Sequence, residues 1–324
     1  MSRMTRAISA CLVALALAAC AAAPAAQPPA AAPTSAPTAE PAAAAPASIQ
    51  ITDALGRQVS LPAAAQRIVS LAPSVTETLF AVGAGPQVVG DTSYCDYPPD
   101  ADALPEIGGF SAKTISVESI VALSPDLVIG GSAAQAPVAE ALAAVGIPTL
   151  IFEPKTFEDV YSNIQQIGYV TGHVADAEAV VTTMRERVAK VEATVAGIPA
   201  EQRPTVFYEV FDEPLMSAGP GTFIGQMIGL TGAASIFADA TEDYPQVSAE
   251  AVIDRDPAVI LGPSSHGDKL TAEQVAARPG WENIGAVRAG RIYLIDGNMV
   301  SRAGPRLADA LEAMAAALYP EQPK

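Results

Sequence analysis

The stretch SVESIVALSPDLVIG at residues 116–130 recurs as SAEAVIDRDPAVILG at residues 248–262, with Ser, Glu, Pro and Gly in step. The first Ser is typical of a helix N-cap, because its hydroxyl can accept a bond from a free backbone N–H. The Glu lies in the first turn, where the helix dipole favours negative charge. The helix ends before the proline, and a buried strand follows. The repeat therefore predicts two related halves, which present Glu118 and Glu250 at equivalent places.

Short β-branched runs alternate with helical patterns on both sides of each copy, which predicts parallel α/β architecture. The expected strands are residues 67–71, 88–90, 127–129, 149–152, 206–208, 259–261 and 292–295. The expected helices include residues 74–82, 223–230 and 306–318, and a pattern without Gly or Pro from 174 to 195 predicts a long helix between the halves. We expect an N-terminal α/β lobe at 49–173, a connecting helix at 174–198 and a C-terminal α/β lobe at 199–324.

Two local predictions concern acidic residues. Ser74 and Glu77 have the spacing of a capping box at the start of the helix 74–82. Glu209, Asp212 and Glu213 follow an expected strand, where carboxylates could serve acid–base chemistry but more often form a solvated loop edge.

The N-terminus begins with Arg3 and Arg6, followed by an apolar run at residues 7–19. The run is about half the ~20 residues needed to span a bilayer, so it predicts a signal peptide at 1–19. It ends in Leu-Ala-Ala-Cys, which resembles the lipobox of bacterial lipoproteins. The resemblance implies that Cys20 is the first mature residue, carries the acyl chains and anchors the protein in a membrane.

Residues 20–48 are dominated by Ala and Pro. Such a segment buries too little apolar surface to offset its ordering entropy, and its prolines favour extended conformations. We interpret it as a disordered tether between the membrane and an extracytoplasmic domain.

Composition excludes several classes of function. A formal charge of −17 makes the chain a poor partner for nucleic acid. Only two histidines occur, His173 and His266, which is few for a transition-metal site. Once Cys11 leaves with the signal peptide and Cys20 is lipidated, Cys95 has no disulfide partner. Dinucleotide, P-loop and nucleophile-elbow motifs are missing from the sequence, so we expect neither an enzyme nor a cofactor.

Several stretches resemble the class III periplasmic binding proteins, which serve ABC importers of cobalamin, haem and iron-siderophores. They are RIVSLAPSVTE at 67–77, SYCDYPP at 93–99, the repeat unit at 116–130, YPQVS at 244–248 and SRAGPR at 301–306. SYCDYPP is similar to the cobalamin branch in particular. The resemblance covers nearly everything after residue 49, and it implies two Rossmann-like lobes joined by a rigid helix, with the ligand in the cleft between them.

The resemblance also implies partners. In the cobalamin branch one glutamate per lobe pairs with arginines of the permease dimer, which works with an ATPase, and the matching positions here are Glu118 and Glu250. The alternative is that both are only helix-terminal charges. We expect the binding protein itself to be a monomer.

The ligand-binding residues implied by the resemblance are Tyr94, Met216, Tyr244 and Met299, all of which fall where the cobalamin branch carries aromatic side chains. The single tryptophan, Trp281, lies elsewhere. Phe110, after two glycines, is therefore a candidate substitute. Arg302 matches a family arginine near the cleft, where it could bind an anionic group or form a salt bridge between lobes. Core packing is the alternative for each of the apolar residues.

Ligands other than a corrinoid stay open. Haem would take an axial Tyr or His, for which Tyr94, Tyr244 and His266 are candidates. A catecholate siderophore would want several cationic side chains, of which only Arg302 is expected in the cleft. A different class of function is a tethered sensor that works without a transporter.

Overall fold

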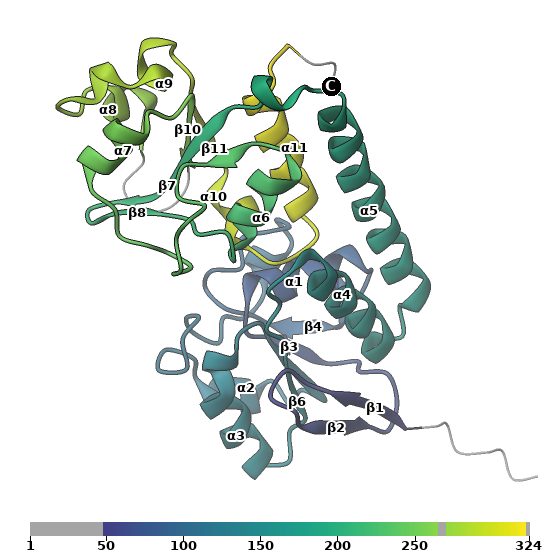
Figure 1. Ribbon diagram of the computed structural model, residues 1–324. Coiled ribbons are helices and arrows are strands. Elements are labelled where there is room, and N and C mark those ends of the chain that lie inside the picture. The colour runs from purple at the N-terminus through teal and green to yellow at the C-terminus, as the bar shows by residue number, and fades with distance from the viewer. Residues whose placement is uncertain (1–47, 265–269, 322–324) are drawn as a thin grey trace, which may run out of the picture. The chain divides into compact units, whose positions relative to one another are not determined.

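The computed structural model describes residues 48–264 and 270–321, where strands and helices alternate along the chain (Figure 1). The strands are β1 Ile49–Thr52, β2 Gln58–Leu61, β3 Ile68–Ser70, β4 Val88–Gly90, β5 Leu127–Gly130, β6 Thr149–Ile151, β7 Thr205–Asp212, β8 Leu215–Ser217, β9 Ala234–Ser235, β10 Val259–Pro263 and β11 Ile292–Ile295. The α-helices are α1 Pro73–Ala81, α2 Val117–Ala122, α3 Ala136–Ala144, α4 Phe157–Thr171, α5 Val174–Ala196, α6 Phe223–Leu230, α7 Ala249–Arg255, α8 Ala272–Ala276, α9 Gly285–Arg288, α10 Gly297–Ser301 and α11 Leu307–Leu318.

The first sheet has the strand order β4-β3-β5-β6 and is parallel throughout. Strands β3, β5 and β6 are buried along their whole length. Apolar runs of this kind are typical of parallel strands that are covered on both faces. An antiparallel β1–β2 hairpin precedes the sheet.

The second sheet has the order β11-β10-β7-β8. In addition, β9 pairs with Thr205 and Val206, the first two residues of β7. β7, β10 and β11 are parallel, whereas β8 runs back antiparallel from β7. The predicted α/β class with parallel sheets is therefore confirmed. The helix expected from residue 174 is also confirmed, as α5.

The internal repeat has the same local structure in both halves. The Ser116 hydroxyl accepts a bond from the Ser119 N–H at the start of α2, and the Ser248 hydroxyl accepts one from the Ala251 N–H at the start of α7. Each helix is followed by a central, fully buried strand, β5 or β10. The predicted caps and strands are thus confirmed.

The predicted capping box at Ser74 and Glu77 is wrong. Helix α1 begins at Pro73 after the N-cap residue Ala72, and no side chain caps it. Proline suits this first position because its missing N–H would have no partner inside the helix. The Glu77 carboxylate is instead bonded to two arginines from the second half.

The expectation of a solvated loop at Glu209, Asp212 and Glu213 also fails for Glu209. Both Glu209 and Asp212 lie within β7, which extends four residues further than its predicted end at 208. Glu209 is 1% exposed and forms an ion pair with Arg278 at 2.6 Å. The buried carboxylate is stabilised there by two hydrogen bonds from the guanidinium group, which compensate for its loss of water.

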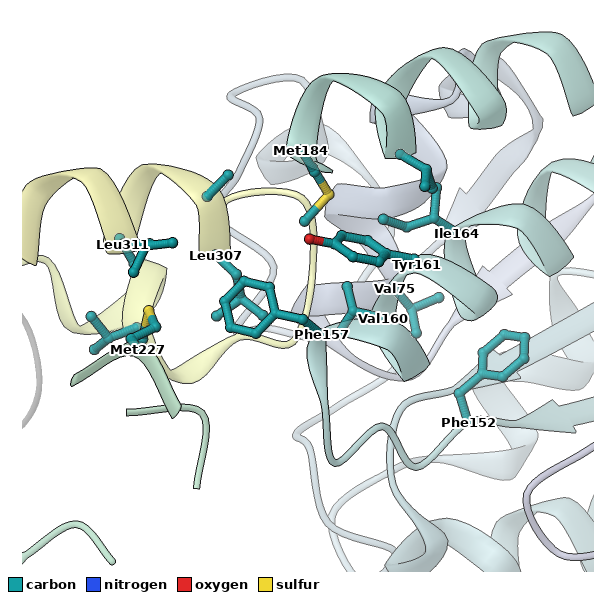
Figure 2. Close-up of a cluster of buried hydrophobic side chains, with 14 of the residues drawn as sticks. Val75, Phe152, Phe157, Val160, Tyr161, Ile164, Met184, Met227, Leu307 and Leu311 are labelled. Carbon is teal, nitrogen blue, oxygen red and sulfur yellow. The ribbon is translucent and has the colours of Figure 1, made fainter. Parts of the chain in front are cut away.

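One hydrophobic cluster contains side chains from both sheets and from the helices between them. Figure 2 shows part of it, where Phe157 and Tyr161 of α4 gather with Met184 of α5, Met227 of α6 and Leu307 of α11. The Phe157 ring also packs edge-on against Phe223, with 6.2 Å between the ring centroids. The two halves therefore share a continuous core.

Candidate functional site

A cavity of about 790 Å³ lies where the carboxyl ends of strands from the first sheet meet the segment around α10. Its described lining consists of Pro73, Ser74, Ser93, Tyr94, Asp96, Phe110, Ser111, Thr114, Gly131, Asn298, Ser301, Arg302 and Ala303. Segments that follow β3, β4 and β5 contribute the residues from the first half. In parallel α/β proteins, ligands bind outside the carboxyl ends of the strands, and sites for small molecules have volumes of about 300–1,000 Å³.

Tyr94 and Phe110 are the large aromatic side chains of the cavity, and they are 60% and 42% exposed. Aromatic rings left this accessible beside a cavity provide flat apolar surfaces for a ligand. The structure therefore brings these two predicted residues together.

A buried glutamine holds the Phe110 loop in place. The Gln135 Nε2 donates to the carbonyl oxygens of Phe110, at 3.0 Å, and Leu71, at 2.7 Å, while its Oε1 accepts a bond from the Gly131 N–H. Gly108, at the start of the loop, has a φ of 105°, a conformation that side chains with a Cβ rarely adopt. Sequence reasoning missed Gln135, because nothing local distinguishes it from a helix-start residue.

The second half contacts the cavity wall through a network of ion pairs around Glu77, which is 3% exposed. The Arg302 Nη1 donates to Glu77 at 2.9 Å and to Asp96 at 2.5 Å. The Arg306 Nε and Nη2 donate to the same Glu77 carboxylate at 2.9 and 2.6 Å. The Arg306 guanidinium also stacks on Tyr97, 4.1 Å from the ring centroid.

Arg302 is thus occupied by partners from the first half, as one of the two sequence hypotheses proposed. Its Nη2 donates to the Tyr94 carbonyl oxygen at 3.1 Å, which fixes the backbone behind a lining residue. Burial lowers the pKa of Arg302, but the hydrogen bonds that Arg302 donates to Asp96 and Glu77 outweigh this effect and raise that pKa overall. The carboxylate of Asp96 further accepts a bond from Asn298 at 3.1 Å.

Three predicted ligand residues are not part of the described lining of this cavity: Met216, Tyr244 and Met299. Met299 packs against the shared hydrophobic cluster. Met216 is in β8, bridged to Gln246, and Tyr244 is 49% exposed near it in the chain segment that runs beside β8.

Both proposed docking glutamates are exposed in the first turns of their helices, Glu118 in α2 and Glu250 in α7. Among the described ion pairs neither carboxylate takes part. Hydrogen bonds from its own backbone N–H and from Ser248 hold the pKa of Glu250 below its usual range. In Figure 1, α2 and α7 lie on the side of the view opposite to α5.

The remaining sequence predictions concern anchors, thiols and metals. Cys20 and His266 lie outside the described residues. Cys95 is buried and hydrogen-bonded to the hydroxyl groups of Thr76 and Thr92, and burial raises the pKa of its thiol. Within residues 48–264 and 270–321 the His, Cys, Asp and Glu side chains form no group suited to a metal ion. In the same part of the chain, every helix is too short or too polar to cross a bilayer.

Comparison with known proteins gives a consistent set of similarities. The family described as "Periplasmic binding protein" matches residues 68–299. An uncharacterized ABC transporter substrate-binding lipoprotein, YvrC of Bacillus subtilis, is 31% identical over 278 residues, which cover 84% of this chain and 86% of the Bacillus protein. A vitamin B12-binding protein of Pectobacterium carotovorum is 33% identical over 245 residues, covering 75% of this chain and 84% of that protein.

A solved structure shares the fold. The periplasmic heme-binding protein RhuT from Roseiflexus superposes with a TM-score of 0.70 at 28% identity, and the match covers 79% of this chain and 98% of RhuT.

Proposed function

The chain belongs to the periplasmic binding protein family, and from this premise we propose that it is an extracytoplasmic lipoprotein that binds a corrinoid and delivers it to an ABC importer. As a member of this family it is a substrate-binding protein of the type that serves importers of cobalamin, haem and siderophores. We further propose that its two lobes, at 49–173 and 199–324, are joined by the helix at 174–198 and hold the ligand between them.

The observation that carries the choice of ligand is the cavity edged by Tyr94 and Phe110 at the carboxyl ends of the first sheet. Two exposed rings suit a large flat macrocycle. Arg302, the cationic group in its described lining, is committed to Glu77 and Asp96, so an anionic siderophore would find little positive charge there. The vitamin B12-binding relative supports the same choice.

Haem is the second candidate, favoured by the structural likeness to RhuT and by the exposed Tyr94 ring at the cavity. Tyr phenolate oxygens are known axial ligands of haem iron. Substitution of Tyr94 by Phe would remove that ligand while keeping the ring.

The ligand is identified by titrating the soluble domain, residues 46–324, with cyanocobalamin, cobinamide, haemin and ferric siderophores. A ligand that binds only the folded state raises the melting temperature by mass action. We expect shifts with the two corrinoids. A shift with haemin alone that Tyr94→Phe abolishes would replace the corrinoid by haem.

The membrane anchor is proposed at Cys20, with support from the similarity to a substrate-binding lipoprotein. Labelling of cells with a tritiated fatty acid should mark the full chain, and Cys20→Ser should remove the label. Equal labelling of both chains would place the acyl group elsewhere.

A further inference from the structure

The second sheet continues beyond its parallel strands as an antiparallel extension. The Ser217 N–H donates to the Pro245 carbonyl oxygen at 3.0 Å, and the Val247 N–H donates to that of Leu215 at 2.9 Å. Residues 243–247 therefore run beside β8 as a further extended segment. In this register Met216 lies opposite Gln246, and Tyr244, two residues before Gln246, projects from the same face.

A β-bulge turns Phe211 onto that same face. Along the β7–β8 ladder Glu209 pairs with Ser217, yet Phe211 pairs with the adjacent Met216, so β7 has one extra residue. Without the bulge Phe211 would project from the same face as Glu209, because side chains alternate along a strand. With the bulge it joins Met216, as expected where a bulge re-aims a side chain.

Lys155, which follows β6 of the first sheet, lies near one end of this face. Burial raises the pKa of the Tyr244 hydroxyl, Asp243 raises it further, and Lys155 opposes both, so Lys155 lies within electrostatic reach of Tyr244. Lys155 follows β6, and its carbonyl oxygen accepts a bond from the Gln226 Nε2 of α6 at 2.7 Å. The bond between Gln226 and Lys155 therefore holds the end of β6 beside α6, the helix that follows β8 in the chain.

The chemistry of the face is apolar at its centre and acidic at its edge. Phe211 is 47% exposed and Tyr244 is 49% exposed, with Met216 between them. Asp243 is adjacent to Tyr244 in the chain, whereas Asp212 projects from the opposite face with Leu215, and the nearby Lys155 is paired with Glu153 at 2.8 Å. Such a surface suits the flat side of a macrocycle whose rim carries uncharged groups, such as the amides of a corrinoid, better than a carboxylate-bearing one.

We propose that Phe211 is a ligand-contacting residue that determines specificity, and that with Met216 and Tyr244 it forms the wall of the ligand site in the second half. The ligand then lies between this wall and the rings of Tyr94 and Phe110. The proposal rests on the proposed function, since it takes a corrinoid as the ligand. Its new element is Phe211, which the bulge in β7 makes available.

The test is calorimetric titration of the soluble domain with cyanocobalamin for the wild type, Phe211→Ala, Phe211→Leu and the control Tyr169→Ala. Tyr169 is a matched control because it is an aromatic residue on α4 with the same 47% exposure. We expect the dissociation constant to rise about tenfold in Phe211→Ala, as for an aromatic anchor in an interface. We expect the dissociation constant to rise about threefold in Phe211→Leu, which keeps apolar contact without a flat ring, and to stay unchanged in Tyr169→Ala.

Two results would overturn the inference, and they differ. If the wild type binds cyanocobalamin and both Phe211 variants bind it equally well, Phe211 does not contact the ligand while the proposed function stands. If the wild type binds neither cyanocobalamin nor cobinamide, the corrinoid function fails and the inference fails with it. Phe211→Leu keeps the test decisive should Phe211→Ala unfold.

Discussion

Glu77 links the two halves through buried ion pairs. Three guanidinium bonds from Arg302 and Arg306 converge on its carboxylate, and the side chain is almost wholly withdrawn from water. Removing one partner of such a group leaves the others buried and uncompensated, which costs far more than losing an exposed pair.

We therefore expect Glu77→Gln to lower the free energy of unfolding by about 3 kcal/mol, measured by urea denaturation. The matched control is Glu158→Gln, which removes the exposed ion pair with Arg185 at 2.5 Å. Its expected effect is below about 1 kcal/mol. Equal losses in the two variants would contradict the role given to Glu77.

Asp91 is a buried carboxyl group whose Oδ2 has no hydrogen-bond partner. Burial raises its pKa to about 7; a hydrogen bond from Cys95 opposes this, and the charges of Glu106 and Asp102 add to it. In the unfolded chain an aspartate has a pKa of about 3.9. Between these values the folded state binds more protons than the unfolded state.

The free energy of unfolding should therefore fall as pH rises from about 4 to 7 and level off above that, and ionisation of Asp91 should account for about 2 kcal/mol of this decrease. Asp91→Asn should remove this part of the pH dependence, measured by urea denaturation at pH 5 and pH 8. Asp254→Asn, an exposed change on α7, should leave the pH dependence as in the wild type. A parallel pH profile for Asp91→Asn and wild type would show that Asp91 is ionised throughout.

At the residue scale the family resemblance implied Tyr94 as a ligand residue and left Phe110 as a candidate substitute, and the structure places both at one cavity. The sequence could not predict that the Glu77 side chain, instead of capping its own helix, forms ion pairs with arginines more than two hundred positions away. Gln135 and Phe211 were missed for a similar reason. Their roles depend on backbone carbonyls and a bulge that form only after the chain has folded.

Among the elements, both copies of the repeat unit contain a residue in the uncommon left-handed backbone conformation. Ser124 and Asp256, each just before the proline of its repeat, have φ angles of 49° and 38°. Residues with a Cβ pay about 1–2 kcal/mol for this left-handed conformation. Asp256 is compensated, because its Oδ1 accepts a bond from the Gly285 N–H at 2.6 Å.

We expect Ser124→Gly to raise the free energy of unfolding by about 0.5–1 kcal/mol, because glycine adopts this conformation without a Cβ clash. Ser124→Ala keeps the clash and should bring no gain. Asp256→Gly should lower stability, because the bond to Gly285 is lost along with the clash. Thermal unfolding of the three variants tests this, and a lower melting temperature for Ser124→Gly would refute it.

At this scale the long, periodic or repeated segments were predictable, as α5, α6, β5 and β10 illustrate. The start of α1 was predicted with the wrong cap, since the Ser-x-x-Glu spacing does not reveal that proline already begins the helix. β8 was not expected either, because Leu215–Ser217 is short and exists by pairing with the end of β7.

In the whole molecule, the equivalent placement of Glu118 and Glu250 supports the proposed docking to a two-subunit permease. We expect Glu118→Ala with Glu250→Ala to slow association with the permease about tenfold at low salt, because exposed charges act mainly on the association rate. Ligand affinity should stay unchanged, since both residues lie outside the described lining of the cavity.

The control for this docking prediction is Glu140→Ala with Glu282→Ala, which removes one other exposed glutamate from each half. Surface plasmon resonance on permease in nanodiscs measures both pairs. If the two double variants associate equally fast, the loss reflects net charge and the docking proposal fails.

The hydrophobic cluster shared by both sheets determines how the protein melts. Each half also has a smaller cluster of its own, but because α4, α5 and α11 contribute to one shared core, we expect the two halves to unfold together. Calorimetry should therefore record a single heat-absorption peak, with van't Hoff and calorimetric enthalpies in agreement. A ligand that contacts only one half would then raise the melting temperature of the entire domain. A probe placed in either half would therefore detect binding to the other half.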